Sequence, residues 1–359
     1  MSRYDEVRRE LAAAPRRWLV TGAAGFIGSH LTETLLMLDQ TVVGLDNFAT
    51  GSRENLADVT NRVGAARAGR FQFLEGDVRD PLACRWAMDG VDVVLHEAAL
   101  GSVPRSMQDP LSTHGANVDG FIQVLVAARA AGVRRLVYAS SSSVYGDDAS
   151  DPKLEDHVGQ TLSPYAASKR IDEIYASTFA RSHGADSVGL RYFNVFGPRQ
   201  DPNGAYAAVI PRWIGQLLGG EPCVVFGDGS TSRDFCYVEN VVQANLLAAC
   251  APATDVAPGV FNVACGDRTS LLELFASIRQ QVSTYLPAAA DRTPRLEAPR
   301  PGDILHSRAS IDRARGFLGY LPAYDLARGL EETVRWYAGR SLRRAARAGT
   351  ADASISSRA

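Results

Sequence analysis

Short apolar runs alternate with longer amphipathic stretches along the first half of the chain. Six runs read as strands, at residues 18–21, 41–45, 71–74, 91–96, 135–139 and 188–192. The stretches at 29–38, 117–131 and 165–182 carry apolar residues at helical spacing. Strands that alternate with helices predict an α/β fold, with a doubly wound parallel sheet and helices on both of its faces.

The pattern becomes less regular after Asn194. A loop signal at 197–204, Gly-Pro-Arg-Gln-Asp-Pro-Asn-Gly, precedes shorter elements that predict a smaller α/β lobe. Near the start of the chain, Tyr4, Val7 and Leu11 recur at helical spacing. Near its end, Ala, Ser and Arg predominate, which is typical of disorder. We expect a helical extension at 1–16, a main domain at 17–194, a smaller lobe at 195–340 with segments that return to the sheet, and a disordered tail at 341–359.

Composition narrows the class of partner. Of the 359 residues, 46% are hydrophobic and 22% are charged, as in an ordinary globular protein. A net charge of -2 offers no field for nucleic acid or acidic membranes, and no apolar run approaches the ~20 residues that span a bilayer. We therefore expect a small-molecule partner, with no nucleic acid and no membrane.

The cysteines and histidines suggest neither disulfides nor a metal. The five cysteines are an odd number, widely spaced and without a C-x-x-C pair, which suits reduced thiols. The charged N-terminus lacks the apolar core of a secretory signal, so we expect a cytoplasmic protein. The six histidines show no metal-ligand spacing, and we expect no metal site.

A glycine-rich turn follows the first apolar run. Gly22, Gly25 and Gly28 stand between a predicted strand and a predicted helix, an order that brings backbone N–H groups and a helix N-terminus up to a pyrophosphate. The spacing departs from the common G-x-G-x-x-G, so a turn that binds nothing is the alternative. Asp46 ends the second run, close to the ~20 residues past the glycines where an acid accepts from ribose hydroxyls. It would repel a 2′-phosphate, so a Rossmann-type domain that binds NAD rather than NADP is predicted.

Polar and small residues follow the predicted strands, where ligands of such sheets bind. These positions are Gly22, Asp46, Asp77, Ala98, Ser141 and Asn194. Tyr165 and Lys169 lie one turn apart on one helix face, where the ammonium favours the ionised phenol and makes it a proton acceptor. A hydroxyl of the run Ser140–Ser143 could donate to a substrate oxygen beside it. Alone, the pair could be an exposed helix face and the serines a polar loop; together they form a plausible Ser/Tyr/Lys constellation.

These motifs resemble the extended short-chain dehydrogenase/reductase family over roughly residues 17–340. The matching set is Gly22-x-x-Gly25-x-x-Gly28, Asp77, His96-x-Ala98-Ala99, Ser141, Tyr165-x-x-x-Lys169 and Arg191-Tyr192-Phe193-Asn194. Within the family, the stretches at 99–106, 200–211 and 231–237 are similar to those of bacterial UDP-N-acetylglucosamine 4-epimerases, which also prefer the N-acetylated uronic acids.

The resemblance implies NAD-dependent C4 epimerisation of UDP-N-acetylhexosamines, or of their uronic acids, for polysaccharide synthesis. Tyr165, held as phenolate by Lys169, would remove the proton of the 4-hydroxyl while C4 passes hydride to NAD, and Ser141 would share the hydrogen bond. The 4-keto intermediate would turn over and take the hydride back on its other face, so NAD stays bound. The family also implies a homodimer through the helices near 117–131 and 165–182.

The resemblance assigns a catalytic set and two binding sets. The catalytic set is Ser141, Tyr165 and Lys169. The NAD positions are Gly22, Gly25, Phe26, Ile27, Gly28, Asp46, Asn47, Phe48, Thr50, Gly51, Asp77, Val78, Ala98, Ala99, Asn117, Tyr165, Lys169, Tyr192 and Val195. The UDP-sugar positions are Gly101, Ser102, Ser141, Ser142, Ser143, Tyr165, Asn194, Ala208, Val209, Val224, Phe226, Arg233, Arg300, Asp303 and Ser307.

Three of these positions bear on the sugar nucleotide. Arg233 and Arg300 match family positions that clamp the diphosphate, for which a guanidinium fork is well suited. Ser307 stands where galactose epimerases place a large tyrosine, and would leave room for an acetamido group. A small loop residue with no such role is the alternative for Ser307.

Related activities remain as alternatives. The 4,6-dehydratases carry an Asp-Glu pair where this chain has Ser142-Ser143, and Asp46 disfavours reductases that exchange NADPH. A UDP-glucose 4-epimerase, a UDP-glucuronate decarboxylase and a non-catalytic NAD-binding regulator stay open. Two departures stand out: Ala207-Ala208 replaces the asparagines of many galactose epimerases, and Glu97 places an acid beside the expected cofactor loop, for which the sequence offers no reason.

Overall fold

The chain divides into two compact units. The computed structural model describes residues 1–203, 207–256, 259–299 and 305–356, without side chains at 254, 255 and 343–356. The first, the sheet unit, comprises Met1–Val195, Asp234–Asp267 and Ser307–Ala323, and the second, the small unit, comprises Phe196–Arg233, Arg268–His306 and Tyr324–Ala359.

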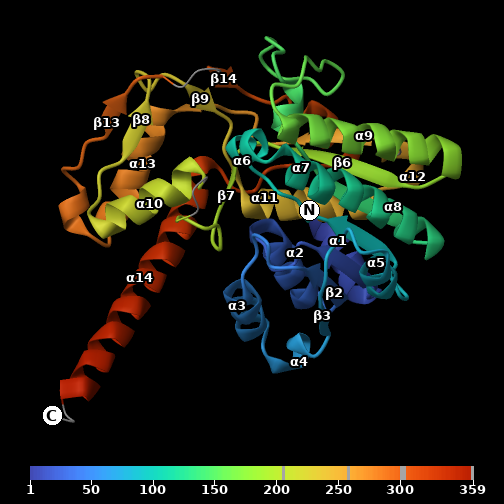
Figure 1. Cartoon of the computed structure of the whole chain (residues 1–359), viewed down its shortest axis with the longest axis horizontal. Helices are drawn as coiled ribbons and strands as arrows, with labels where there is room; N and C mark the ends of the chain where they lie inside the picture. The colour runs from blue at the N-terminus through green and yellow to red at the C-terminus, as the bar shows by residue number, and fades with distance from the viewer. Residues whose placement is uncertain (204–206, 257–258, 300–304, 357–359) are drawn as a thin grey trace. The chain divides into compact units, whose positions relative to one another are not determined.

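The sheet unit is built on a seven-stranded parallel sheet in the order β11-β6-β5-β4-β1-β2-β3 (Figure 1). The strands are β1 Arg17–Thr21, β2 Thr41–Asp46, β3 Phe71–Glu75, β4 Val93–His96, β5 Arg135–Ser141, β6 Ser187–Tyr192 and β11 Gly259–Val263. The predicted doubly wound, Rossmann-type sheet is therefore confirmed. Because β1 pairs with both β2 and β4, the strand order reverses there, which is where such sheets bind ligands.

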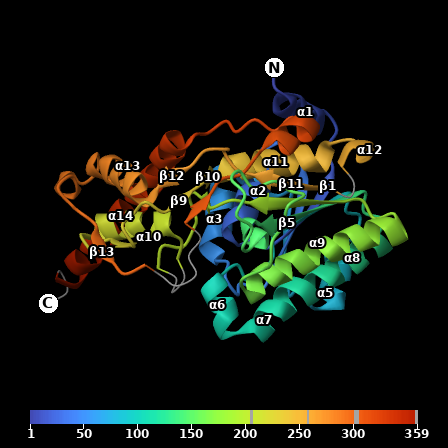
Figure 2. The ribbon, with the colours of Figure 1, turned by 90° about the horizontal axis from the view of Figure 1, so that it is seen from above.

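Helices cover both faces of this sheet, as Figure 2 shows. One face carries α1 Arg3–Ala13, α2 Phe26–Met37 and α11 Val238–Cys250, and the other carries α5 Pro81–Ala87, α8 Gly120–Ala130 and α9 Pro164–His183. The remaining helical segments are α3 Arg53–Val63, α4 Ala65–Ala68, α6 Val103–Gln108, α7 Pro110–His114, α12 Ala253–Val256, the π-helices η1 Gly115–Asp119 and η4 Ala314–Leu318, and the 3-10 helix η2 Ser142–Tyr145.

The first strand shows why its sequence is apolar throughout. Trp18, Leu19 and Val20 are all fully buried. Trp18 and Val20 belong to one hydrophobic cluster and Leu19 to the other, because successive side chains of a strand point to opposite faces. A strand covered on both faces therefore needs a continuous apolar run rather than alternation.

The predicted N-terminal helix is α1. The Ser2 hydroxyl accepts from the Asp5 N–H while the Asp5 carboxylate accepts from the Ser2 N–H, a capping box that begins the helix. Val7 and Leu11 are buried in the core, and α1 contacts α11. The helix thus adds to the layer that covers this face of the sheet.

The described part of the small unit contains three α-helices and short strand pairs. The helices α10 Val209–Gly219, α13 Leu271–Ser283 and α14 Leu326–Ser356 contact one another. Strand β8 Val224–Phe226 pairs in parallel with β13 Arg295–Glu297, and β9 Ser232–Arg233 pairs antiparallel with β12 Thr269–Ser270. The described elements are completed by η3 Pro287–Ala289 of the small unit, by β10 Cys236–Tyr237 of the sheet unit, and by β7 Val195–Phe196 and β14 His306–Ser307, each of which has one residue in either unit.

Helix α14 differs from the expectation of a disordered tail. It runs from Leu326 to Ser356 and so includes most of the residues at 341–359. Alanine, arginine and leucine are strong helix formers, so a helix that starts on a buried face can continue into a segment with few large apolar side chains. That buried face is formed by Leu330, Val334 and Tyr337.

Candidate active site

The glycine-rich turn lies between β1 and α2 and admits no side chains at its closest approaches. A Cβ on Gly22, where φ is +69°, would lie 2.8 Å from the Ala98 nitrogen, and a Cβ on Gly28 would lie 2.1 Å from the Gly22 oxygen. Gly25 is the N-cap of α2, with no side chain over the helix end. The turn therefore presents bare backbone and a helix N-terminus, a cradle that fits the pyrophosphate of a dinucleotide.

Asp46 connects this turn to the loop that follows β2. One carboxyl oxygen accepts from the Ala24 N–H at 3.0 Å and the other from the Phe48 N–H at 2.7 Å. Burial raises the pKa of Asp46, against the effect of these hydrogen bonds. Each carboxylate oxygen has a second lone pair, so recognition of a ribose by Asp46 stays a prediction that this geometry permits.

Asp77 follows β3 and holds two neighbouring side chains. The Arg79 guanidinium lowers the pKa of Asp77 to about 2, and the Asn47 amide donates to the same carboxylate at 2.8 Å. The carboxylate is therefore ionised throughout the physiological range, next to the loop that carries Phe48 and Gly51.

Asn117 joins the loop after β4 to helix α9. Its side-chain oxygen accepts from the Leu100 N–H at 2.8 Å, and its nitrogen donates to the Ser168 hydroxyl at 2.9 Å. In the same loop, the Ser102 hydroxyl accepts from the Arg105 N–H and caps α6. The structure thus gives Asn117 and Ser102 positioning contacts, which the sequence did not reveal.

Glu97, the acid without an explanation in the sequence, belongs to a chain of three side chains. The Tyr192 hydroxyl donates to Glu97 Oε1 at 2.8 Å and accepts from the Asn245 amide at 2.8 Å. Burial raises the pKa of Glu97 to about 8, although Tyr192 and the charge of Lys169 act in the opposite direction. At neutral pH this carboxyl therefore holds its proton, and no carboxylate charge competes there for Lys169.

Tyr165 and Lys169 lie in the first turns of α9. The Ser163 hydroxyl accepts from the Ala166 N–H at 3.1 Å and Pro164 occupies the first turn, so the start of the helix is fixed just before Tyr165. Tyr165 is half-buried, whereas Lys169 is only 2% exposed. The predicted pair is therefore on one helix face, with a phenol that can be reached and an ammonium held below the surface.

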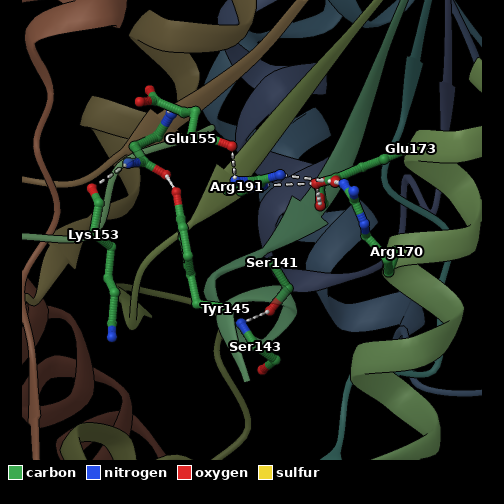
Figure 3. A network of polar contacts seen from close by, with 10 residues as sticks. Ser141, Ser143, Tyr145, Lys153, Glu155, Arg170, Glu173 and Arg191 are labelled. Atoms are coloured by element: carbon green, nitrogen blue, oxygen red, sulfur yellow. Dashed lines mark hydrogen bonds and ion pairs between the residues drawn. The ribbon is translucent and has the colours of Figure 1, made fainter. Parts of the chain in front are cut away.

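The serine run crosses from β5 into η2. Ser141 ends the strand, and its hydroxyl accepts from the Ser143 N–H at 3.1 Å (Figure 3). The Ser140 hydroxyl donates to Glu173 of α9 at 2.7 Å, and α9 contacts both β5 and η2. The strand end that carries Ser141 is thus fastened to the helix that carries Tyr165.

Glu173 and Arg191 form the centre of a buried polar network (Figure 3). Two guanidinium nitrogens of Arg191 donate to the two oxygens of Glu173 at 2.8 and 2.9 Å, and Arg170 adds a third bond at 2.7 Å. Burial would raise the pKa of Glu173, but the bonds from Arg191 bring it below its usual value. The carboxylate is therefore ionised and ties α9 to β6.

The network continues through Tyr145 to β11. The Arg191 guanidinium lies 4.9 Å from the centre of the Tyr145 ring, and the Tyr145 hydroxyl donates to Asn262 at 2.6 Å. Asn262 also donates from its amide to the Lys153 and Ser310 carbonyls, and its own N–H donates to Glu155. Asn262 thus fixes the segment between β5 and α9 from a strand that lies 107 to 117 positions further along the chain.

The structure places the predicted ligand residues in both units. All predicted NAD residues and Gly101, Ser102, Ser141, Ser142, Ser143, Asn194 and Ser307 are in the sheet unit, while Ala208, Val209, Val224, Phe226 and Arg233 are in the small unit. The Asn194 amide donates to the Asp234 carbonyl at 2.9 Å, and Arg233 donates to the Leu305 carbonyl at 3.2 Å. Arg300 and Asp303 lie outside the described residues.

Two further structural findings concern metals and membranes. Within the described ranges, no three His, Cys, Asp or Glu side chains gather in a way that could hold a metal ion. In the same part of the chain, no helix combines the length and the apolar character needed to cross a bilayer.

Comparison with known families identifies the protein family to which the glycine-rich turn and the helix with Tyr165 and Lys169 belong. The family model described as the NAD dependent epimerase/dehydratase family matches residues 18–264. The chain belongs to this family. It is thus an NAD-dependent enzyme of the epimerase type, and the glycine cradle has the bare backbone that the pyrophosphate of such a cofactor requires.

Relatives of this NAD-dependent epimerase carry the names of different sugars. It is 39% identical to a UDP-glucose 4-epimerase of Mycolicibacterium smegmatis, over 90% of this chain and 99% of the relative. A UDP-N-acetylglucosamine 4-epimerase structure from Methanobrevibacter ruminantium is 37% identical with a TM-score of 0.81, over 91% and 99% of the chains. A UDP-glucuronic acid 4-epimerase structure from Bacillus cereus, with NAD, is 30% identical with a TM-score of 0.78, over 89% and 98%. The reaction class is shared, while the sugar differs.

Proposed function

We propose that this epimerase interconverts the C4 epimers of UDP-N-acetylhexosamines or of their uronic acids, through a 4-keto intermediate. The observation that carries the proposal is the capped start of α9, which places Tyr165 and the buried Lys169 on one face of a helix fastened to the end of β5. The Methanobrevibacter structure, named for UDP-N-acetylglucosamine, supports the N-acetylated substrate.

The residues of the sheet unit can support each proton step. NAD, when bound, would supply the acceptor and donor of the hydride at C4. The phenolate of Tyr165 takes the proton of the sugar 4-hydroxyl, and the Lys169 ammonium stabilises the phenolate. Ser141 shares the hydrogen bond to that oxygen. After the keto sugar has rotated to present its other face, Tyr165 returns the proton to the oxygen at C4.

Direct product analysis tests the proposal. Purified protein, without added cofactor, is incubated with UDP-N-acetylglucosamine, and the 4-epimer is sought by NMR. Parallel samples contain the uronic acid form of that sugar, UDP-glucose and UDP-glucuronate. We expect the N-acetylated sugars to be converted fastest. Fastest conversion of UDP-glucose would instead favour the activity named for the Mycolicibacterium relative, and loss of carbon dioxide from UDP-glucuronate would indicate a decarboxylase. If none of these sugars is converted, the result would support the alternative of a non-catalytic NAD-binding regulator.

Ser307 provides the first mutational prediction, on the choice of sugar. Ser307 lies in β14 as a partly buried serine, and its carbonyl accepts from the Asp234 N–H at 3.0 Å. We expect Ser307→Tyr to depress kcat/KM for UDP-N-acetylglucosamine about 10-fold or more relative to UDP-glucose, because a phenol would occupy the space of the acetamido group. Steady-state kinetics on both sugars measure this, with Ser307→Ala as control. An equal loss of kcat/KM on the two sugars would contradict a role of Ser307 in the choice of sugar.

A homodimer is part of the proposal. Helices α8 and α9 contact each other and expose the apolar side chains of Val126, Ile174 and Tyr175. Such side chains on two adjacent helices favour a contact with the same helices of a second copy, related by a two-fold axis. Light scattering of the purified protein tests this part, and a monomeric mass would reject it.

A further inference from the structure

Asp172 is a buried acid for which the proposed reaction has no use. It is 1% exposed, and Oδ2 accepts from the Lys169 ammonium at 3.3 Å. Its other oxygen, Oδ1, is buried and has no hydrogen-bond partner among the described residues. A carboxyl group in such a position is costly to bury unless its interaction with the lysine compensates.

The spacing on α9 places Asp172 behind the lysine. Tyr165, Lys169 and Asp172 stand at positions i, i+4 and i+7, which share one face of a helix. The ammonium therefore has the phenol one turn before it and the carboxyl one turn after it. Within the described part of the chain, Asp172 is the acid that the ammonium contacts.

The other titratable groups around Lys169 and Asp172 do not replace this counter-ion. His96 is the last residue of β4, and burial and the charge of Lys169 lower its pKa to about 3, so its ring is neutral. Glu97 holds its proton at neutral pH, and Glu173 on α9 is engaged by Arg191. Tyr138, on β5, is fully buried and its pKa lies well above the usual value because of that burial.

We propose that Asp172 is a positioning residue, the counter-ion that holds the Lys169 ammonium and limits how strongly its charge favours the ionised form of Tyr165. The inference rests on the proposed function, in which Tyr165 is the proton acceptor. Because Asp172 is only 1% exposed, it acts through Lys169 in this inference rather than by binding sugar or cofactor.

The sign of the effect on Tyr165 follows from the charges. Burial raises the pKa of Asp172 to about 7, with Lys169 acting in the opposite direction. Above that pH the carboxylate offsets the ammonium and disfavours a second negative charge on the phenol. Below it, Asp172 is neutral and the whole ammonium charge favours the phenolate. Removal of the acid should therefore let Tyr165 ionise at a lower pH.

The test is the isosteric variant Asp172→Asn in the holoenzyme, with Asp119→Asn as a matched control at an exposed acid of η1. We expect the ionisation of Tyr165 to move down by about one pH unit. It is measured by ultraviolet difference absorbance against Tyr165→Phe. The acid limb of kcat/KM should follow it, while kcat on the plateau falls about 10-fold because the ammonium is no longer held, with KM unchanged.

An unmoved phenol titration together with an unmoved acid limb in a folded Asp172→Asn protein would overturn the inference. Because the phenol titration is read without substrate, it separates this inference from the proposed function, whose failure would appear as no turnover in the unsubstituted enzyme. If Asp172→Asn does not fold, the pairing is tested by the melting temperature of Lys169→Met with and without Asp172→Asn. There the added Asp172→Asn should raise the melting temperature, since it removes an unpaired buried acid. A lower melting temperature would reject the pairing.

Discussion

Tyr165→Phe should abolish interconversion of the 4-epimers while leaving NAD bound. The phenyl ring keeps the packing at the start of α9 but has no oxygen to accept the proton of the 4-hydroxyl. Loss of a positioned acid–base group lowers turnover about 10²- to 10⁴-fold. Product formation is followed by NMR, and the cofactor released from denatured protein is quantified by absorbance.

The matched control for this variant is Tyr175→Phe. Tyr175 lies on the same helix and is 38% exposed, in the proposed contact between two copies and outside the catalytic set, so removal of its hydroxyl should leave both turnover and NAD content unchanged. Turnover of Tyr165→Phe at the rate of the control would end the assignment of Tyr165 as the proton acceptor. A loss of bound NAD in Tyr165→Phe would instead indicate that the phenol binds the cofactor.

Arg191→Met should destabilise the protein by about 3–5 kcal/mol in the free energy of unfolding, because it leaves the Glu173 carboxylate buried without its bidentate partner. The contrast is Arg170→Met. Arg170 also bonds the Glu173 carboxylate, at 2.7 Å, but its side chain is 41% exposed, so its loss should cost at most about 1 kcal/mol. Urea unfolding, followed by circular dichroism, compares the two variants.

A further variant separates charge from packing at this site. Arg191→Met combined with Glu173→Gln removes the stranded charge, and we expect it to recover part of the stability that Arg191→Met loses. Equal destabilisation by Arg170→Met and Arg191→Met would contradict the view that burial makes Arg191 the important partner.

The sequence predicts the inner strands β1, β2 and β4 well because they are buried and so read as continuous apolar runs, such as the one at Trp18. It does not indicate β11 in advance, because this strand returns from a distant part of the chain to pair with β6. Tyr165 and Lys169 could be predicted from one helical spacing. Asp172 stands only three residues further, but an acid at that distance from a lysine is typical of a solvated helix face, and only burial distinguishes it.

Long-range partners left no comparable signal. The contact of Tyr192 with Glu97 and Asn245 joins residues that lie 95 and 53 positions from it, so nothing in the local pattern explains the acid at 97. Arg191 belongs to a motif in the sequence, but its partner Glu173 lies on another element and the pair is visible only in the fold. Polar contacts between elements depend on tertiary packing, which periodicity does not encode.

The hydrogen bonds of Asn262 also have a consequence for the order in which the protein can mature. A chain leaves the ribosome from its N-terminus, so β1 to β6 and α9 emerge well before β11. Until Asn262 follows, the Tyr145 hydroxyl and the Lys153 carbonyl lack the partner that seats the segment between Ser141 and Tyr165. The nascent domain can therefore form most of its sheet early. The hydrogen bonds of Asn262 that hold the segment between Ser141 and Tyr165 can form only late in synthesis.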